Sequence, residues 1–136
     1  MLVLSLIDAM DRNDLSILDQ ICDPDLVAHF MDAELSLEQV KRAAAGFVAS
    51  FPDLTHIILD LVAVDDRVML RAVDRATHRG VYKGIAATGR PVAFETVATY
   101  RIAAGKIVEV WQQMDVQTLI RQLTEFRDPA APDSRF

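Results

Sequence analysis

Residues 94–115 read FETVATYRIAAGKIVEVWQQMD, and the rest of the chain is organised around this stretch. Apolar and polar residues alternate with a period of two up to Ala104-Gly105, and the alternation resumes after that pair. This period is typical of β-strands, and a small residue followed by glycine is typical of a tight turn. We therefore predict a long β-hairpin. A two-residue turn and a bulged turn both fit, and a shift of one residue would reverse the face that each strand presents.

The second strand of this hairpin places Trp111, Gln113 and Asp115 on one face, because side chains repeat every two residues in a strand. A carboxylate beside a large ring can provide an acid or a base in an apolar pocket, since burial raises its pKa. Asp115 also directly precedes a segment with helical periodicity, residues 116–126, whose first turn it could cap. Both interpretations of Asp115 stay open.

The chain has 136 residues, which is long enough for one domain with its own hydrophobic core. It carries 14 basic and 20 acidic residues and has no basic run that could neutralise phosphates, so nucleic acid is not an expected partner. No apolar run reaches membrane-spanning length, and Met1–Ile7 lacks the features of a signal peptide. The single cysteine, Cys22, cannot form an internal disulfide. We therefore expect a cytoplasmic protein without a membrane partner.

Three helices are expected in the first part of the chain, and the third should begin at Ser36, where Ser36 and Gln39 form a capping box. The other expected elements are helices over 2–11 and 15–22, the latter capped by Asp14, strands over 26–31, 54–64 and 67–77, and a loop over 80–91. Helices grouped beside a mostly antiparallel sheet predict an α+β fold. We expect a cone-shaped barrel: a strongly bent sheet, about three N-terminal helices on its concave side and a short C-terminal helix. Residues 1–126 would form a single domain and 127–136 a flexible C-terminal tail.

Seven short pieces follow one another along the chain: FPDL (51–54), DRV (66–68), ATHRG (76–80), ATG (87–89), GKIVEVW (105–111), Asp115 and QL (122–123). In this order and spacing they resemble the SnoaL-like polyketide cyclase, or ester cyclase, family of the nuclear transport factor 2-like superfamily. The resemblance extends from Leu4 to Leu123 and implies the cone-shaped fold and a homodimer. Characterised members close a ring by intramolecular aldol condensation without a metal or cofactor. The resemblance therefore implies a cofactor-independent enzyme whose partner is a small hydrophobic carbonyl compound.

The same resemblance implies two catalytic residues. In the family, the aspartate that follows the Trp-x-x-x-Asp strand is the general acid/base, and that position is Asp115 here. His29 matches the histidine of the family's Pro-Asp-x-x-x-His strand, where it could donate to an enolate oxygen or hold Asp115. Val110 stands where the family usually has histidine. An enzyme and a non-catalytic ligand-binding or assembly module both fit this pattern.

A pocket for a flat or ring-shaped ligand is expected to use further side chains. These are Trp111, Tyr100, Phe94, Gln113, Phe30, Phe51 and His78. Ordinary core packing is the alternative for the aromatic residues, and for Phe51 above all. Because Phe30 and His29 are neighbours on one strand, at most one of them should point into a pocket unless the strand is bulged.

The other histidines have simpler structural interpretations. His78 stands where a strand runs into a loop that it could hydrogen-bond, and His56 opens a strand and is expected at the surface or an interface. The histidines lack the spacing of metal ligands, so no metal is expected, and the family resemblance implies that no cofactor is needed. The strands at 54–64 and 68–73 are apolar on both faces, and one face would need a partner, which favours a homodimer.

Overall fold

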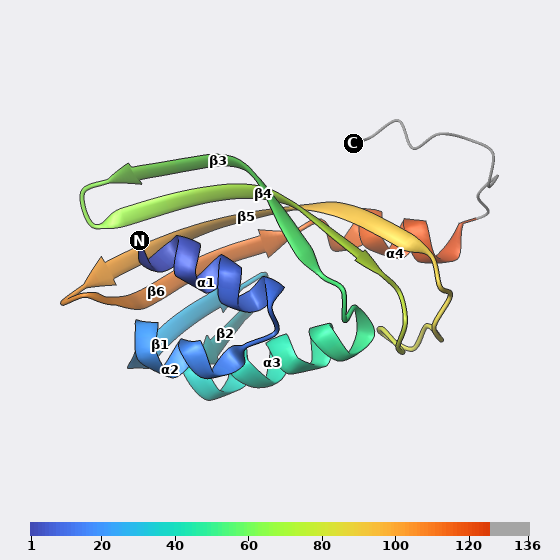
Figure 1. Cartoon of the computed structure of the whole chain (residues 1–136), viewed down its shortest axis with the longest axis horizontal. Coiled ribbons are helices and arrows are strands. Elements are labelled where there is room, and N and C mark those ends of the chain that lie inside the picture. Colours follow the sequence, from blue (N-terminus) through green and yellow to red (C-terminus); the bar gives the residue numbers. More distant parts are fainter. Residues whose placement is uncertain (126–136) are drawn as a thin grey trace.

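The computed structural model describes residues 1–125, in which helices pack against one face of a single bent β-sheet (Figure 1). The helices are α1 (Leu2–Asp11), the 3₁₀ helix η1 (Leu15–Ile17), α2 (Leu18–Ile21), α3 (Leu37–Ser50) and α4 (Val116–Thr124). The strands are β1 (Cys22–Phe30), β2 (Ala33–Ser36), β3 (Thr55–Val64), β4 (Arg67–Thr77), β5 (Pro91–Ala103) and β6 (Lys106–Met114). The flexible tail expected over 127–136 lies outside the described residues.

The strands form one sheet in the order β2-β1-β6-β5-β4-β3. The pairing is antiparallel throughout except between β1 and β6, which run parallel. The predicted α+β class with N-terminal helices on one side of a bent sheet is confirmed. The expected barrel is not closed, because β2 and β3 stand at opposite edges of the sheet and do not pair with each other.

The predicted hairpin is formed by β5 and β6. Its turn residues, Ala104 and Gly105, have φ angles of 50° and 75°, the left-handed conformation that two-residue hairpin turns require. The register then shifts by one residue between Arg101 and Ile102. As a result Trp111 lies opposite Thr99, and Val110 lies opposite Tyr100 on the other face of the sheet.

Local sequence rules account for the start of α3. The Ser36 side chain accepts a hydrogen bond from the Gln39 backbone N–H at 3.3 Å, and the Gln39 side chain accepts one from the Ser36 N–H at 2.8 Å. This is the predicted capping box, which satisfies two backbone donors that the helix cannot satisfy itself.

The segment between α1 and α3 differs from the expected one. The second helix is shorter than predicted, and Asp14 accepts a hydrogen bond from the Ser16 side chain instead of capping the helix backbone. Strand β1 begins at Cys22, four residues earlier than the strand expected over 26–31, and it includes Asp23 and Pro24. Pro24 is tolerated there because the β1–β6 ladder is irregular between Cys22 and Val27, so its missing N–H leaves no ladder bond broken. The short edge strand β2 was not predicted.

Two groups of buried apolar side chains form the core. One lies between the N-terminal helices, β1 and the middle of the sheet, and includes Val3, Leu18, Leu70 and Ile107. The other lies toward α4 and includes Phe51, Phe94, Leu119 and Leu123. No helix within residues 1–125 is both long and apolar enough to cross a membrane.

Candidate active site

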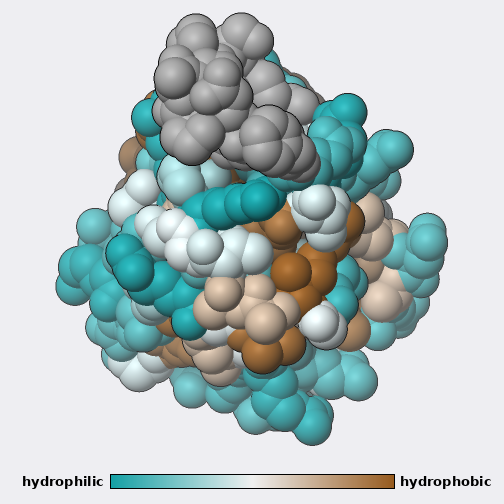
Figure 2. Space-filling view, turned by 90° about the vertical axis from the view of Figure 1, so that its right-hand side faces the viewer, coloured by the Kyte–Doolittle hydropathy of each residue, from teal (hydrophilic) through white to brown (hydrophobic). Residues whose placement is uncertain are grey.

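A cavity of about 300 Å³ lies between the inner face of the sheet, which faces the helices, and helices α1 and α3. Its lining is mostly apolar and includes Leu6, Ile7, Met10, Val40, Phe47, Leu54, Val110 and Met114. This volume is at the small end of the range for ligand pockets. Apolar side chains also gather on the end of the molecule where α3, the loop before β5 and α4 meet, with hydrophilic residues around them (Figure 2).

A few polar side chains converge on this cavity, which is the usual composition of a small-molecule site. They come from separate elements: Asp74, His56, Tyr100, Gln112 and Lys83. Asp74 lies on the inner face of β4 and pairs across the sheet with His56 of β3.

Asp74 is almost fully buried, with 4% of its surface exposed. Its Oδ2 accepts a hydrogen bond from the Thr96 hydroxyl at 2.8 Å, whereas its Oδ1 has no hydrogen-bond partner among the described residues. Burial raises the pKa of this carboxyl, and the nearby His56 and the Thr96 hydrogen bond only partly oppose that shift. Asp74 is therefore a carboxyl group with one oxygen available and an increased affinity for a proton.

His56 connects Asp74 to helix α1. Its Nδ1 lies 2.5 Å from Oδ1 of Asp11, and its Nε2 lies 3.6 Å from Oδ1 of Asp74. An ionised carboxylate can only accept, so Nδ1 carries the proton in the bond to Asp11. The distance of 3.6 Å to Asp74 is within ion-pair range but too long for a hydrogen bond. Only about 10% of the His56 side chain is exposed, and it lines the cavity, whereas the sequence placed it at the surface or an interface.

Two further titratable side chains of the cavity are held in their neutral forms. Tyr100 is buried, and desolvation followed by the negative charge of Asp74 raises the pKa of its hydroxyl. Burial also raises the pKa of the Cys22 thiol to about 11. Near neutral pH the cavity therefore presents a phenol and a thiol rather than their anions.

Asp115 lies at the boundary between β6 and α4. It is the N-cap of α4, where Oδ1 accepts from the Thr118 N–H at 3.0 Å and Oδ2 accepts from the Thr118 hydroxyl at 2.7 Å. It is not among the residues that line the cavity. The geometry thus matches the capping interpretation of this residue.

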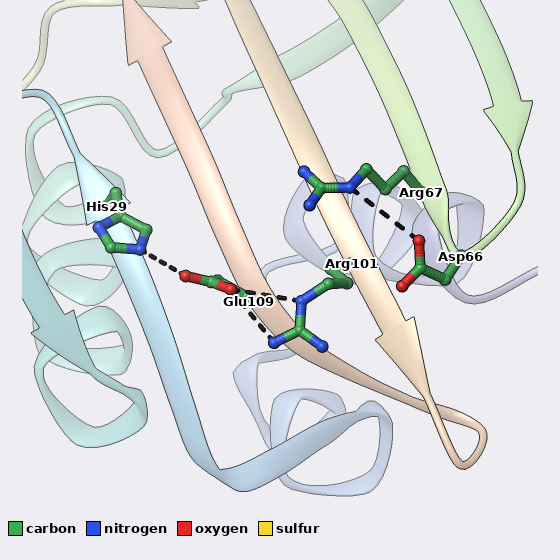
Figure 3. Close-up of polar contacts among 5 residues, drawn as sticks. All are labelled: His29, Asp66, Arg67, Arg101 and Glu109. Atoms are coloured by element: carbon green, nitrogen blue, oxygen red, sulfur yellow. Dashed lines mark hydrogen bonds and ion pairs between the residues drawn. The ribbon is translucent and has the colours of Figure 1, made fainter.

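His29 contributes to the cavity lining, but its ring takes part in contacts on the outer face of the sheet. Nε2 lies 2.7 Å from Oε2 of Glu109, and Glu109 also pairs with Arg101 (Figure 3). The ring stacks on Trp111 with centroids 5.4 Å apart. The hydrogen bond from His29, assisted by Arg101, lowers the pKa of Glu109. The structure does not bring His29 and Asp115 together.

Trp111 and Gln113 also lie on the outer face. They pair with Thr99 and Val97 of β5, whose side chains alternate with the inward-facing Tyr100. The Arg67 guanidinium lies 5.0 Å from the centre of the Trp111 ring, a cation–π arrangement. Neither residue lines the cavity.

The remaining predicted pocket residues divide between the cavity and the core. Tyr100 and Phe30 line the cavity. Phe94 and Phe51 are fully buried in the second core group. His78 is also fully buried: it stacks on Phe51, and its Nδ1 accepts a hydrogen bond from the Thr88 N–H at 3.2 Å. It therefore holds the loop before β5, as its position in the sequence suggested.

Neither Asp74 nor His56 was predicted as a site residue, although the alternation of residues along β4 indicates that Asp74 is buried. Val68, Leu70 and Ala72 alternate along β4 as the inward-facing apolar residues, and Asp74 is the next member of that series. A carboxylate in the apolar register of a strand has to be buried, which is rare without a reason. Within residues 1–125 no group of three or more His, Cys, Asp or Glu side chains is arranged to hold a metal ion.

Several solved protein structures are similar to this one over nearly the whole chain. AclR of Streptomyces galilaeus, described provisionally as a hydroxylase, is 32% identical over 93% of this chain and 95% of its own, with a TM-score of 0.85. IdmH of Streptomyces antibioticus, described provisionally as a polyketide cyclase, is 31% identical over 90% and 95%, with a TM-score of 0.81. TsrD of Streptomyces laurentii is 25% identical over 92% and 93%, with a TM-score of 0.81. No curated protein sequence matches this chain.

The sequence profile of one family covers almost the whole described chain. It matches residues 1–123, which contain every helix and strand except the last residue of α4. The order of motifs, the open α+β sheet and the helix-covered cavity all agree with that match. The protein belongs to the SnoaL-like polyketide cyclase family.

Proposed function

We propose that this protein is a cofactor-independent enzyme that transfers a proton within a small hydrophobic carbonyl compound. The reaction would be an aldol-type ring closure or a related isomerisation or dehydration. The observation that carries the proposal is Oδ1 of Asp74, which is buried beside His56 in a mostly apolar cavity and has no hydrogen-bond partner within residues 1–125. Membership of the SnoaL-like polyketide cyclase family supports the reaction class.

The proposed steps use Asp74 twice. Its carboxylate takes a proton from the carbon next to a carbonyl group, which leaves an enolate. The enolate carbon attacks a second carbonyl carbon of the same molecule, and a carbon–carbon bond forms. The oxygen of that second carbonyl then takes the proton back from Asp74. All atoms of the substrate are kept, so the product is an isomer of the substrate, and dehydration would follow by loss of its new hydroxyl as water.

Two features of the cavity suit these steps. The raised pKa of Asp74 makes its carboxylate a stronger base than an exposed aspartate, which helps it to remove a weakly acidic C–H proton. Tyr100 lines the same cavity with a neutral hydroxyl that can donate to the enolate oxygen as charge develops there. The apolar lining excludes water and strengthens both interactions.

The geometry favours Asp74 over Asp115 for the acid/base role that the family resemblance gives to Asp115. Both carboxylate oxygens of Asp115 accept hydrogen bonds from Thr118, and the residue does not line the cavity. Asp74 has one oxygen without a hydrogen-bond partner among the described residues, and it lines the cavity from β4. The two assignments predict opposite results for single substitutions.

A non-catalytic ligand-binding module is the second candidate, and one observation favours it. Val110 lines the cavity at the position where the family usually has histidine. An apolar side chain there leaves fewer polar groups to assist proton transfer. Under this candidate the wild-type protein would be stabilised by the ligand but would not convert it.

The test is turnover of an aromatic β-keto ester that carries a second carbonyl group within reach of its activated carbon. Wild type should give a product of unchanged mass, and Asp74→Asn should lower kcat by about 100-fold or more, the usual contribution of a general base. Asp115→Asn is the matched control, because asparagine is also a good helix cap and should leave turnover intact.

Three outcomes would overturn parts of this proposal. Equal turnover by Asp74→Asn and wild type would remove Asp74 from the mechanism. Thermal stabilisation by the ester without any conversion would support the binding module instead. A product heavier by one oxygen atom would indicate hydroxylation, the activity ascribed provisionally to AclR.

A further inference from the structure

Asp11 lies at an unusual place for an acidic side chain. It is the last residue of α1, whose final turn carries no basic residue. The C-terminal end of a helix carries partial negative charge, so a carboxylate there is unfavourable unless a hydrogen-bond donor or a cationic group lies close by. His56 is the group that Asp11 contacts, at 2.5 Å. The cost of placing Asp11 at this helix end is therefore offset through its bond to His56.

The bond from Asp11 determines how His56 faces the cavity. With Nδ1–H donated to Asp11, the other ring nitrogen, Nε2, is directed toward Oδ1 of Asp74. Flipping the ring by 180° would put Cδ2 in the place of Nδ1 and break the short bond to Asp11. The orientation of Nε2 toward Asp74 is thus fixed from helix α1, which also supplies Leu6, Ile7 and Met10 to the cavity lining.

The three side chains also differ in their access to water. The side chain of Asp11 is 29% exposed, that of His56 is 10% exposed and that of Asp74 is 6% exposed. This series leads from solvent to the cavity through one imidazole ring. The ring of His56 thus lies between the more exposed carboxylate and the buried one, and its Nε2, 3.6 Å from Oδ1 of Asp74, needs only a small shift to come within hydrogen-bond distance and pass a proton.

We propose that Asp11 is a positioning residue that fixes the tautomer of His56 and thereby connects Asp74 to solvent protons. The inference rests on the proposed function, because it assigns Asp11 a part in the chemistry of Asp74. The charged groups packed against His56 among the described residues are Asp11 from α1 and Asp74 from β4. Tyr100 from β5 is the other titratable group whose proton affinity responds to Asp74.

The experiment reads the His56 ring directly in the full-length protein. Long-range ¹H–¹⁵N spectra resolve the ring nitrogens of the three histidines, and His56→Gln assigns the signals of His56. Wild type should show a protonated Nδ1, whereas Asp11→Ala should shift the tautomer population toward a protonated Nε2. Asp11→Asn keeps a neutral acceptor and should restore most of the wild-type pattern.

Asp8→Asn is the matched control, because Asp8 lies on the same helix and pairs with the exposed Arg12 rather than with His56. It should leave both the spectrum and the turnover unchanged. Asp11→Ala should lower kcat about tenfold with little change in KM, the fold-change expected for one lost charge-assisted hydrogen bond. Far-UV circular dichroism and thermal unfolding verify the fold of each variant. If Asp11→Ala does not fold, Asp11→Leu, which also lacks an acceptor for the His56 Nδ1–H, supplies the same readout.

The two proposals fail in distinguishable ways. A folded Asp11→Ala variant with an unchanged His56 tautomer would overturn the role of Asp11 while leaving Asp74 as the base. A folded Asp11→Ala variant with the kcat of wild type would do the same. Full turnover by Asp74→Asn would instead overturn the proposed function, whatever the spectrum of His56 shows. A tautomer shift together with lowered kcat is the result that the inference predicts.

Discussion

Replacing Asp74 by asparagine is expected to stabilise the protein. The carboxylate is almost fully buried, and its Oδ1 has no hydrogen-bond partner among the described residues. Asparagine keeps the acceptor for the Thr96 hydroxyl and removes the buried charge. A buried polar group left unsatisfied costs about 1–3 kcal/mol, and part of that cost remains because the new amide N–H₂ must also find partners. The net gain in unfolding free energy should be about 1 kcal/mol, or a rise in Tm of roughly 3–5 °C for a domain of this size.

The sign of this effect depends on pH in a defined way. The folded-state pKa of Asp74 is raised above its unfolded value, so the folded state binds more protons in the window between the two. The destabilisation by Asp74 therefore grows as pH rises through that window and is complete above the folded-state pKa. The gain from Asp74→Asn should be full above the raised folded-state pKa. It should disappear below about pH 4, the ordinary pKa of an aspartate.

The assay is thermal and urea unfolding of wild type and Asp74→Asn across this pH range. Asp115→Ala is the companion variant, because it removes a cap instead of a buried charge. It should lower the free energy of unfolding by about 1 kcal/mol, the opposite sign. A lower Tm for Asp74→Asn than for wild type at neutral pH would refute the reasoning, since the buried charge would then be a net stabiliser.

Three further predictions use other parts of the structure. A Cβ on Gly80 would lie 2.5 Å from the Ala49 carbonyl oxygen, so Gly80→Ala should lower the free energy of unfolding by about 1–3 kcal/mol. Gly46 on α3 has open space around it, so Gly46→Ala should raise the free energy of unfolding by about 0.5–1 kcal/mol. Equal unfolding curves for the two variants would contradict this. Tyr100→Phe should lower kcat roughly 100-fold while ligand-induced thermal stabilisation is kept, and unchanged kcat would remove its donor role. Met69 is 44% exposed on the outer face of the sheet, so Met69→Lys should shift the expected homodimer to a monomer in light scattering; a wild type that is already monomeric would refute the dimer.

Much of the fold could be predicted from the sequence because its signals are local. The period-two alternation and the Ala104-Gly105 turn predicted β5 and β6, and the Ser36–Gln39 spacing predicted the start of α3. The parallel pairing of β1 with β6 could not be predicted this way, because it joins residues about 80 positions apart, as in the contact of His29 with Glu109. The four residues of β2 are too few to show a period.

The candidate site was predicted less well, because the face of a strand decides which side chains reach the cavity. Trp111 and Tyr100 were both expected in the pocket, but the hairpin register puts them on opposite faces of the sheet. Asp115 is bonded to Thr118 as a helix cap. Asp74 and His56 come together only because β3 and β4 pair in a register that the sequence does not encode locally.

The most direct test of the central proposal is hydrogen exchange on a bound ketone. The protein would be incubated in D₂O with an aromatic ketone that carries an exchangeable proton next to its carbonyl group, and deuterium uptake at that carbon followed by mass spectrometry. Wild type and Asp115→Asn should both exchange the proton well above the protein-free rate, and Asp74→Asn should not. Uptake by Asp74→Asn at the wild-type rate would contradict the assignment of Asp74 as the group that moves the proton.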